Sequence, residues 1–260
     1  MIPIKTRDEI EIMREGGRRL KEVFERVLPE IKMGVSKKEI DKKVEKLILD
    51  FGGQPSFKMV PKYQWASCIT VNEEVVHGVP NDEMIEAGDI VSLDVGMYYQ
   101  GFHTDRAETI EIRDTGYGIR DTRYRIQDTE FLRVGKLALE KAIQAAIPGN
   151  RVGHISLAIQ KAIEERGFSP VRALTGHGVG KKLHEEPLIP CFLKDKLSET
   201  PVLKEGMVLA IEVIYCAGKP DLVLRPDNWT VATKDGKISA LFEETVAITA
   251  GGSLVLSNGA

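Results

Sequence analysis

The stretch that decides the fold is GDIVSLDVGMYYQGFHTDRAET, residues 88–109. Its first part alternates side chains with the period of two that predicts a β-strand, and a second strand is expected after a glycine-containing turn. This period lets the carboxylates of Asp94 and Asp105 point at one spot. A buried carboxylate requires a cation, a hydrogen-bond donor or a proton. Two aspartates in solvated turns would explain this stretch alone equally well.

The composition is that of an ordinary folded protein. The 260 residues are 42% hydrophobic and 29% charged, with a net charge of -3, and no basic run indicates nucleic-acid binding. No apolar run is long enough to span a bilayer, and the N-terminus lacks the apolar segment of a secretion signal. Three cysteines without CxxC spacing argue against a disulfide framework and predict a cytoplasmic protein.

Helices are predicted where apolar residues recur at helical spacing, over residues 6–28, 37–51, 129–147 and 154–166. Thr6 with Glu9 and Ser36 with Glu39 form the capping-box pattern at the first two, and Asp128 is the expected N-cap of the third. Strands are also expected near residues 68–71, 176–180, 208–215 and 242–248.

The helical part of the sequence contains an internal repeat. Six positions recur in the same order at a constant offset: Gly34, Ile40, Val44, Ile48, Gly52 and Pro55 against Gly149, Ile155, Ile159, Ile163, Gly167 and Pro170. A coincidence of helix boundaries is the alternative explanation for this match taken alone.

Two strand segments repeat as well, AGDIVSLDV (87–95) with EGMVLAIEV (205–213) and DRAET (105–109) with EETVA (243–247). Asp94 therefore corresponds to Glu212, and Asp105 to Glu243. Three matches in chain order predict two similar halves, roughly residues 30–110 and 145–250, within one catalytic domain of residues 1–260. Helices gathered on one face of a largely antiparallel sheet make the predicted fold class α+β.

Four inward carboxylates, at Asp94, Asp105, Glu212 and Glu243, cannot all stay ionised at one site without cations. Two histidines are candidates for one imidazole ligand: His177, which lies between glycines that allow a close approach of the backbone, and His184. This set has too many ligands for one tetrahedral zinc ion. Two divalent ions that share bridging carboxylates fit it better, and such pairs are used in hydrolysis. The oxygen-rich set favours manganese, iron(II), cobalt or zinc over copper.

Other hydrolytic motifs are missing from the sequence. There is no G-x-S-x-G elbow, and HEEP (184–187) is not the H-E-x-x-H of zinc peptidases. Cys68 has no feature of a thiol nucleophile, which makes it a packing or pocket residue.

Seven motifs resemble those of the type I methionine aminopeptidases, which have the pita-bread fold. They extend over almost the whole chain: NEEVVHGVP (72–80), GDIVSLDVG (88–96), GFHTDRAET (101–109), GHGVGKKLHEEP (176–187), LAIEV (209–213), DNWTV (227–231) and FEETVAIT (242–249). The resemblance implies a pita-bread fold of two pseudo-symmetric halves around a dinuclear metal site. It also implies removal of the N-terminal methionine by hydrolysis of the first peptide bond.

The resemblance implies a ligand set as well. One metal ion would be held by Asp105, His177, Glu212 and Glu243, and the other by Asp94 together with Asp105 and Glu243 as bridges. The metals remain open among cobalt, manganese, iron(II) and zinc.

Roles toward the substrate are implied in the same way. Glu212 would carry the proton of the attacking water, His184 would hydrogen-bond the substrate carbonyl oxygen, and His77 would contact the backbone nitrogen at or beyond the scissile bond. The pocket for the methionine side chain would use Tyr63, Cys68 and Trp229. Ordinary packing is the alternative for Tyr63 and Trp229.

Three other kinds of protein share features with this sequence. Xaa-Pro-cleaving aminopeptidases share the five ligands but resemble this chain with a large N-terminal domain added, whereas helices here begin at residue 6. Type II methionine aminopeptidases carry an inserted helical segment, for which residues 187–206 leave no room. Non-catalytic peptide-binding members of the fold lose ligands, and all five are present here.

The expected partners are the N-termini of nascent polypeptides and peptides, with ribosome association as a further possibility. The chain is expected to act as a monomer without nucleic-acid or membrane partners.

Overall fold

The computed structural model describes residues 2–113 and 129–258. Over these residues the helices are α1 (Arg7–Val27), α2 (Lys37–Asp50), α3 (Glu130–Ala145) and α4 (Val152–Glu164), with short 3-10 turns at Leu28–Glu30, Phe57–Met59 and Leu197–Glu199. The strands are β1 (Gln54–Pro55), β2 (Cys68–Val71), β3 (Glu74–Val76), β4 (Ile90–Tyr99), β5 (Phe102–Glu111), β6 (Ser169–Pro170), β7 (Thr175–Gly178), β8 (Glu185–Pro190), β9 (Val208–Cys216), β10 (Leu222–Leu224), β11 (Val231–Thr233), β12 (Ser239–Thr249) and β13 (Gly252–Val255).

The four predicted helices are present, and both capping boxes form as the sequence predicts. Two helix starts differ from the prediction. The N-cap of α3 is Thr129, whose hydroxyl accepts the N–H of Leu132; the predicted cap, Asp128, lies outside the described residues. Helix α4 starts two residues before the predicted His154, because the imidazole of His154 accepts the backbone N–H of Arg151 and so caps the earlier turn.

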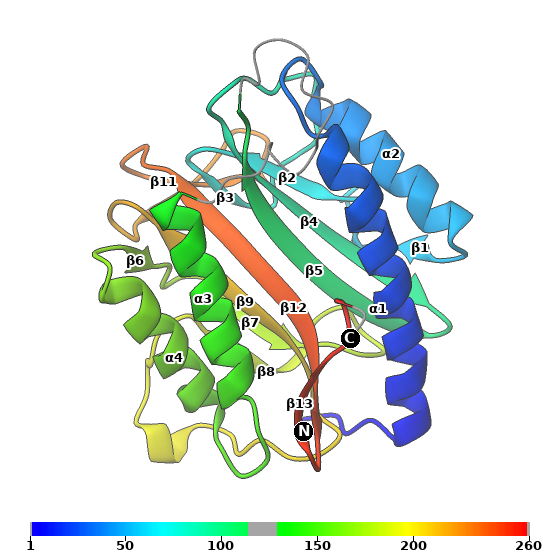
Figure 1. Cartoon of the computed structure of the whole chain (residues 1–260), viewed down its shortest axis with the longest axis vertical. Coiled ribbons are helices and arrows are strands. Elements are labelled where there is room, and N and C mark those ends of the chain that lie inside the picture. Colours follow the sequence, from blue (N-terminus) through cyan, green and yellow to red (C-terminus); the bar gives the residue numbers. More distant parts are fainter. Residues whose placement is uncertain (1, 114–128, 259–260) are drawn as a thin grey trace.

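The main sheet is antiparallel, in the order β1-β4-β5-β12-β9-β7-β8 (Figure 1). The opening stretch forms the hairpin β4–β5 as predicted. Its turn consists of Gln100 and Gly101, with φ of 46° and 95°, the left-handed pair that a two-residue hairpin turn requires. A smaller sheet has the strand order β10-β11-β3.

The two halves correspond in space. Strand β4 pairs with β5, the two-residue strand β1 and β2, just as β9 pairs with β12, the two-residue strand β6 and β7. Gly34 and Gly149 have φ of 83° and 86°, and Gly52 and Gly167 have φ of 73° and 76°. The halves meet where β5 pairs with β12. The α+β class with two pseudo-symmetric halves is therefore confirmed, while the single-domain assignment over residues 1–260 stays a prediction.

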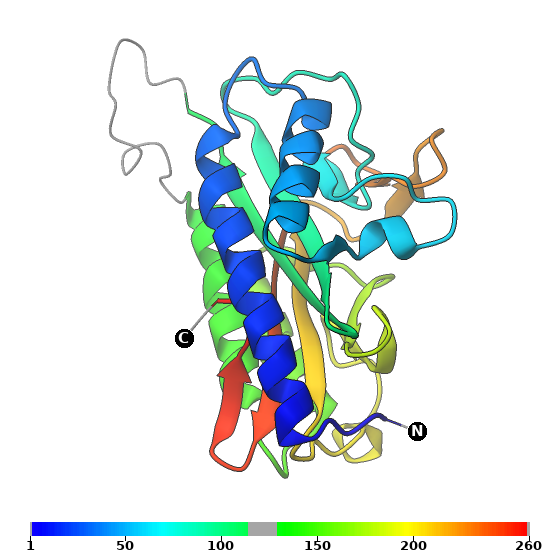
Figure 2. The same cartoon turned by 90° about the vertical axis from the view of Figure 1, so that its right-hand side faces the viewer.

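The helices cover one face of the main sheet, and loops with the smaller sheet lie over the other (Figures 1 and 2). The alternation in β4 buries Val91, Leu93 and Val95 in the core under α1 and α2, and the second half has an equivalent core under α3 and α4. Helix α1 packs closely against the segment after β13, where a Cβ at Gly17 would lie 2.2 Å from the carbonyl oxygen of Leu256. Because the helices cover one face of the sheet, the strand side chains that alternate to the other face point toward the loops.

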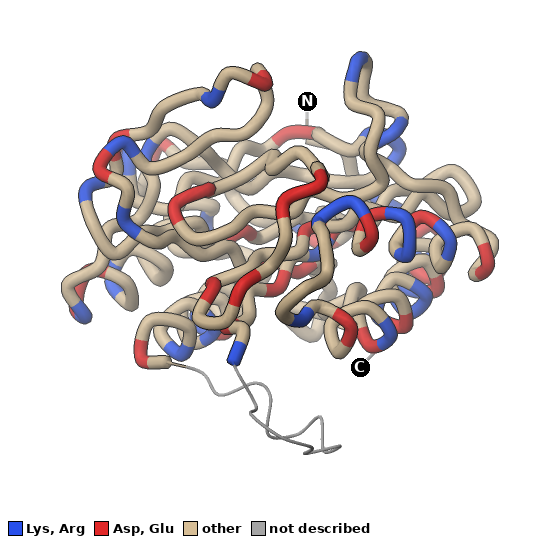
Figure 3. The backbone as a smooth tube through the Cα atoms, turned by 90° about the horizontal axis from the view of Figure 1, so that it is seen from above, with Lys and Arg blue, Asp and Glu red and all other residues tan. Residues whose placement is uncertain are grey.

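The outer turns of the helices carry charges of both signs (Figure 3). Exposed pairs such as Lys46 with Asp50 join residues one helical turn apart. This surface agrees with the interspersed charges of the sequence.

Candidate metal centre

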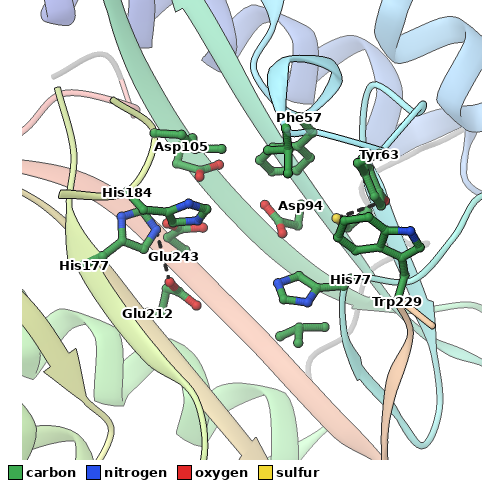
Figure 4. Close-up of a pocket in the computed structure, with 14 residues that line it drawn as sticks. Phe57, Tyr63, His77, Asp94, Asp105, His177, His184, Glu212, Trp229 and Glu243 are labelled. Atoms are coloured by element: carbon green, nitrogen blue, oxygen red, sulfur yellow. Dashed lines mark hydrogen bonds and ion pairs between the residues drawn. The ribbon is translucent and has the colours of Figure 1, made fainter. Parts of the chain in front are cut away.

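A pocket with a cavity volume of about 170 Å³ opens on the loop-covered face of the sheet (Figure 4). It is lined by all ten residues predicted from the sequence: Tyr63, Cys68, His77, Asp94, Asp105, His177, His184, Glu212, Trp229 and Glu243. Phe57, Val60, Val76 and Leu183 complete its wall. The structure thus brings together residues that lie far apart in the sequence.

Four consecutive strands each contribute one carboxylate to the floor of the pocket. Asp94 comes from β4, Asp105 from β5, Glu243 from β12 and Glu212 from β9. Glu243 lies directly opposite Glu212 in the β9–β12 ladder. The period of two turns all four side chains to the face that the helices do not cover.

A tight group forms where the two halves meet. Ligand atoms of Asp105, His177 and Glu243 all lie within 4.8 Å of one another, and Nε2 of His177 lies 3.5 Å from Oε1 of Glu212. Nδ1 of His177 is 2.8 Å from the carbonyl oxygen of Gly178 and must donate to it, since a carbonyl only accepts. A neutral His177 therefore turns the Nε2 lone pair toward the carboxylates, the orientation of a metal ligand.

The buried carboxylates of this group need a cation to stay ionised. Burial, followed by repulsion among the carboxylates, raises the pKa of Asp94, Glu212 and Glu243 well above the ordinary range, and burial raises that of Asp105 to about 7. Burial also lowers the pKa of His177 to about 4, so a proton on the imidazole does not neutralise the site.

Two buried oxygens, Oδ1 of Asp94 and Oε1 of Glu243, have no hydrogen-bond partner in the structure. Oxygen donors left without partners inside a protein fit a divalent cation. The donor set of four carboxylates and one imidazole therefore suits the metals that the sequence analysis predicts.

Two further histidines face the pocket. The rings of His184 and His177 are 4.5 Å apart, and His77 lies on the other side, beside Trp229 (Figure 4). Burial lowers the pKa of both His77 and His184, which keeps them neutral and able to hydrogen-bond at neutral pH. His77 has φ of 56°, a strained backbone for a residue other than glycine and a feature often found at functional sites.

The side of the pocket away from His177 is apolar. The Tyr63 ring lies 5.0 Å from that of Trp229 and 5.1 Å from that of Trp65, both edge to face. Its hydroxyl donates to the Ser67 carbonyl oxygen and lies 3.2 Å from Sγ of Cys68. Tyr63 and Trp229 therefore pack against each other and also line the pocket.

Three lining residues, Phe57, Val60 and Val76, are not among those predicted from the sequence. Phe57 and Val60 belong to the same aromatic-rich loop as Tyr63, and Val76 precedes His77, so their neighbours in the sequence are the only signal that could have identified them. His103 is buried just outside the wall, where Nδ1 is 2.9 Å from the hydroxyl of Ser56.

Comparisons with known proteins agree with this geometry. The family model of metallopeptidase family M24 matches residues 11–250. Methionine aminopeptidase 1 of Bacillus subtilis is 42% identical over 257 residues, which cover 99% of either chain. The crystal structure of methionine aminopeptidase from Thermotoga maritima has a TM-score of 0.90 and 38% identity, and covers 99% of either chain.

Prolidase from Pyrococcus furiosus is a more distant neighbour. It has a TM-score of 0.74 and 28% identity, and the match covers 98% of this chain but 65% of the prolidase. No helix in residues 2–113 and 129–258 is long and apolar enough to cross a membrane. The match extends over nearly the whole length of the methionine aminopeptidases but over only part of the prolidase. This chain therefore belongs to metallopeptidase family M24 and, within it, to the type I methionine aminopeptidases.

Proposed function

We propose that this enzyme hydrolyses the first peptide bond of proteins and peptides that begin with methionine, using two divalent metal ions held by Asp94, Asp105, His177, Glu212 and Glu243. The observation that carries the proposal is the convergence of four buried carboxylates and one imidazole beside an apolar pocket. Divalent ions bound there would lower the pKa of a water molecule and polarise the scissile carbonyl.

The ligands divide between the two ions. His177 and Glu212 would hold one ion and Asp94 the other, while Asp105 and Glu243 would contribute to both. The 4.8 Å grouping of Asp105, His177 and Glu243 supports this division, because ligand atoms of both carboxylates lie close to those of the imidazole.

The protein's own groups move the proton and stabilise charge. Glu212 takes the proton of the attacking water and returns it to the departing amine, a role that suits a buried carboxylate of raised pKa. Neutral His184 donates a hydrogen bond to the carbonyl oxygen as that oxygen gains negative charge. His77 contacts the backbone nitrogen at or beyond the scissile bond.

The apolar wall selects the first residue of the substrate. Aromatic rings and a thiol form a soft surface for a thioether, because methionine sulfur makes favourable contacts with aromatic edges. Tyr63, Cys68 and Trp229 provide that surface together with Phe57 and Leu183.

A panel of three tripeptides tests which first residue the enzyme removes. Met-Ala-Ser, Leu-Ala-Ser and Ala-Pro-Ser are assayed with cobalt(II), manganese(II), iron(II) and zinc in turn. Cleavage of Met-Ala-Ser ahead of the other two supports the proposal, while preference for Ala-Pro-Ser indicates the Xaa-Pro-cleaving alternative. Absence of cleavage with every metal indicates a non-catalytic peptide-binding member.

The natural substrates in this proposal are the N-termini of nascent polypeptides in the cytoplasm. The enzyme acts on them as a monomer, and association with the ribosome would bring it to them. Sedimentation with ribosomes from an extract tests this part.

A further inference from the structure

A buried ion pair joins the start of the chain to the turn that bears His184. Nζ of Lys5 lies 2.7 Å from Oε2 of Glu185, and the two side chains are 5% and 7% exposed. The other carboxylate oxygen of Glu185 accepts the backbone N–H of Lys182. Both oxygens therefore have partners, one from Lys5 and one from the turn itself.

The path of Lys5 is fixed along its length. Its backbone N–H donates to the carbonyl oxygen of Gly206 at 2.7 Å, just before β9 begins. Its side chain passes Gly180 so closely that a Cβ there would lie 2.4 Å from Cε of Lys5. The absence of a side chain at Gly180 thus makes room for the ammonium group to reach Glu185.

The anchored turn connects the two histidines of the site. It leaves β7 after Gly178, the residue that follows His177, and enters β8 at Glu185, the register partner of Gly178. His184 precedes Glu185 directly, and its ring lies 4.5 Å from that of His177. The backbone of His184 is therefore held one residue from the ion pair.

We propose that Lys5 is a positioning residue for His184: by holding Glu185, it fixes the turn that presents the His184 imidazole to the substrate carbonyl. This inference rests on the proposed function, because it assigns His184 the carbonyl contact. Lys5 acts through Glu185 and is not itself a catalytic residue. The arrangement also gives a function to the first glutamate of the HEEP motif.

The test is a double-mutant cycle on the metal-loaded enzyme, with Met-Ala-Ser as substrate. We expect K5M to lower kcat by about 10- to 100-fold, because a displacement of about 1 Å in a catalytic group costs that much. We expect KM and the affinity for manganese(II), measured by calorimetry, to stay within about threefold of wild type, since neither the pocket nor the ligands change. In the H184A background, K5M should lower kcat by less than about threefold.

Two variants serve as controls. K5R keeps the charge and should retain most of the activity. K181M removes a neighbouring lysine of the same turn, whose side chain is 70% exposed where it pairs with Glu9, and should leave kcat unchanged. If K5M fails to fold, the neutral pair K5M/E185Q takes its place in the same cycle, because it leaves no buried charge without a partner.

Any of three results overturns the positioning role. The first is an unchanged kcat in K5M, and the second is that K5M lowers kcat by the same factor in the wild-type and H184A backgrounds. The third is a loss of manganese(II) affinity that accounts for the lower rate. A wild-type enzyme that does not cleave Met-Ala-Ser would instead contradict the proposed function. The two failures are therefore distinguishable.

Discussion

Arg106 lies opposite Glu244 where β5 pairs with β12, one residue along each strand from Asp105 and Glu243. Nε of Arg106 is 3.6 Å from Oε1 of Glu244, and the guanidinium stacks over the ring of Phe24 in α1. The metal site and this ion pair thus occupy opposite faces of the same strand junction.

Removing Arg106 should destabilise the fold. The R106M variant leaves the buried carboxylate of Glu244 without its cation, and burial already raises the pKa of that group. We expect the free energy of unfolding to fall by about 3 kcal/mol. Urea denaturation measures it, with K46M, which breaks the exposed pair with Asp50, as a control that should change by less than about 1 kcal/mol. Equal effects of the two substitutions would contradict the prediction.

Removing the charge of Asp94 should have opposite effects on stability and metal binding. Its Oδ1 is buried without a hydrogen-bond partner, and Asp105 and Glu212 repel its negative charge. In EDTA we expect D94N to raise the free energy of unfolding by about 1 kcal/mol. Calorimetry with manganese(II) should show that the variant loses one of two binding events. A D94N protein less stable than wild type in EDTA would show that the carboxylate does not oppose folding.

Replacing Glu212 should abolish most of the activity and keep the fold. The E212Q variant has nearly the same shape but cannot accept the proton of the attacking water, so kcat should fall by at least about 100-fold. The near-ultraviolet circular dichroism should match that of wild type. E186Q, at an exposed glutamate of the HEEP motif, is the matched control. Full activity in E212Q, or in H177A, would remove the basis of the dinuclear scheme.

A larger side chain at position 68 should weaken the cleavage of peptides that begin with methionine. Cys68 packs with Phe57, Tyr63 and Leu183 in the pocket wall. A leucine there would take space from a methionine side chain, and kcat/KM for Met-Ala-Ser should fall by about tenfold or more. The C68S variant keeps the size of the side chain and should stay close to wild type. The wall would not contact the first residue if both variants cleaved the peptide equally well.

Acid should weaken the fold through His103. Burial lowers its pKa in the folded protein to about 4, while the unfolded value is about 6.5. The unfolded chain binds more protons between these values, so this contribution to stability is complete above about pH 6.5 and is lost as the pH falls toward about 4. The H103N variant can keep the bond to Ser56 but does not titrate.

Urea denaturation in EDTA at several values between pH 7 and pH 4.5 measures the difference between H103N and wild type. The free energy of unfolding of H103N, relative to that of wild type, should rise steadily as the pH falls. Because the other groups titrate in both proteins, a difference that does not vary with pH would exclude His103 as the source.

Local pattern predicted much of this molecule. Alternation around Asp94 and Asp105 gave the correct faces of β4 and β5, and the repeat extended the inference to Glu212 and Glu243. The capping boxes at Thr6 and Ser36 placed two helix starts to the residue. These features depend on neighbours within a few residues, which the sequence displays directly.

Contacts over long separations were not predictable in this way. Lys5 meets Glu185 and Arg106 meets Glu244 only because the fold brings distant segments of the chain together. Neither pair has a spacing rule, and each lysine or arginine in the sequence has many possible partners. The start of α4 was missed for a related reason, since His154 is not among the residues that usually cap a helix.

The meeting of β5 and β12 has a consequence for the synthesis of the enzyme itself. Asp94 and Asp105 leave the ribosome before their partner Glu243, which lies more than about a hundred residues later in the sequence. The growing chain therefore has no complete set of ligands until Glu243 has been made. A chain whose synthesis has not yet reached Glu243 is thus inactive, and neither half released by proteolysis would retain activity.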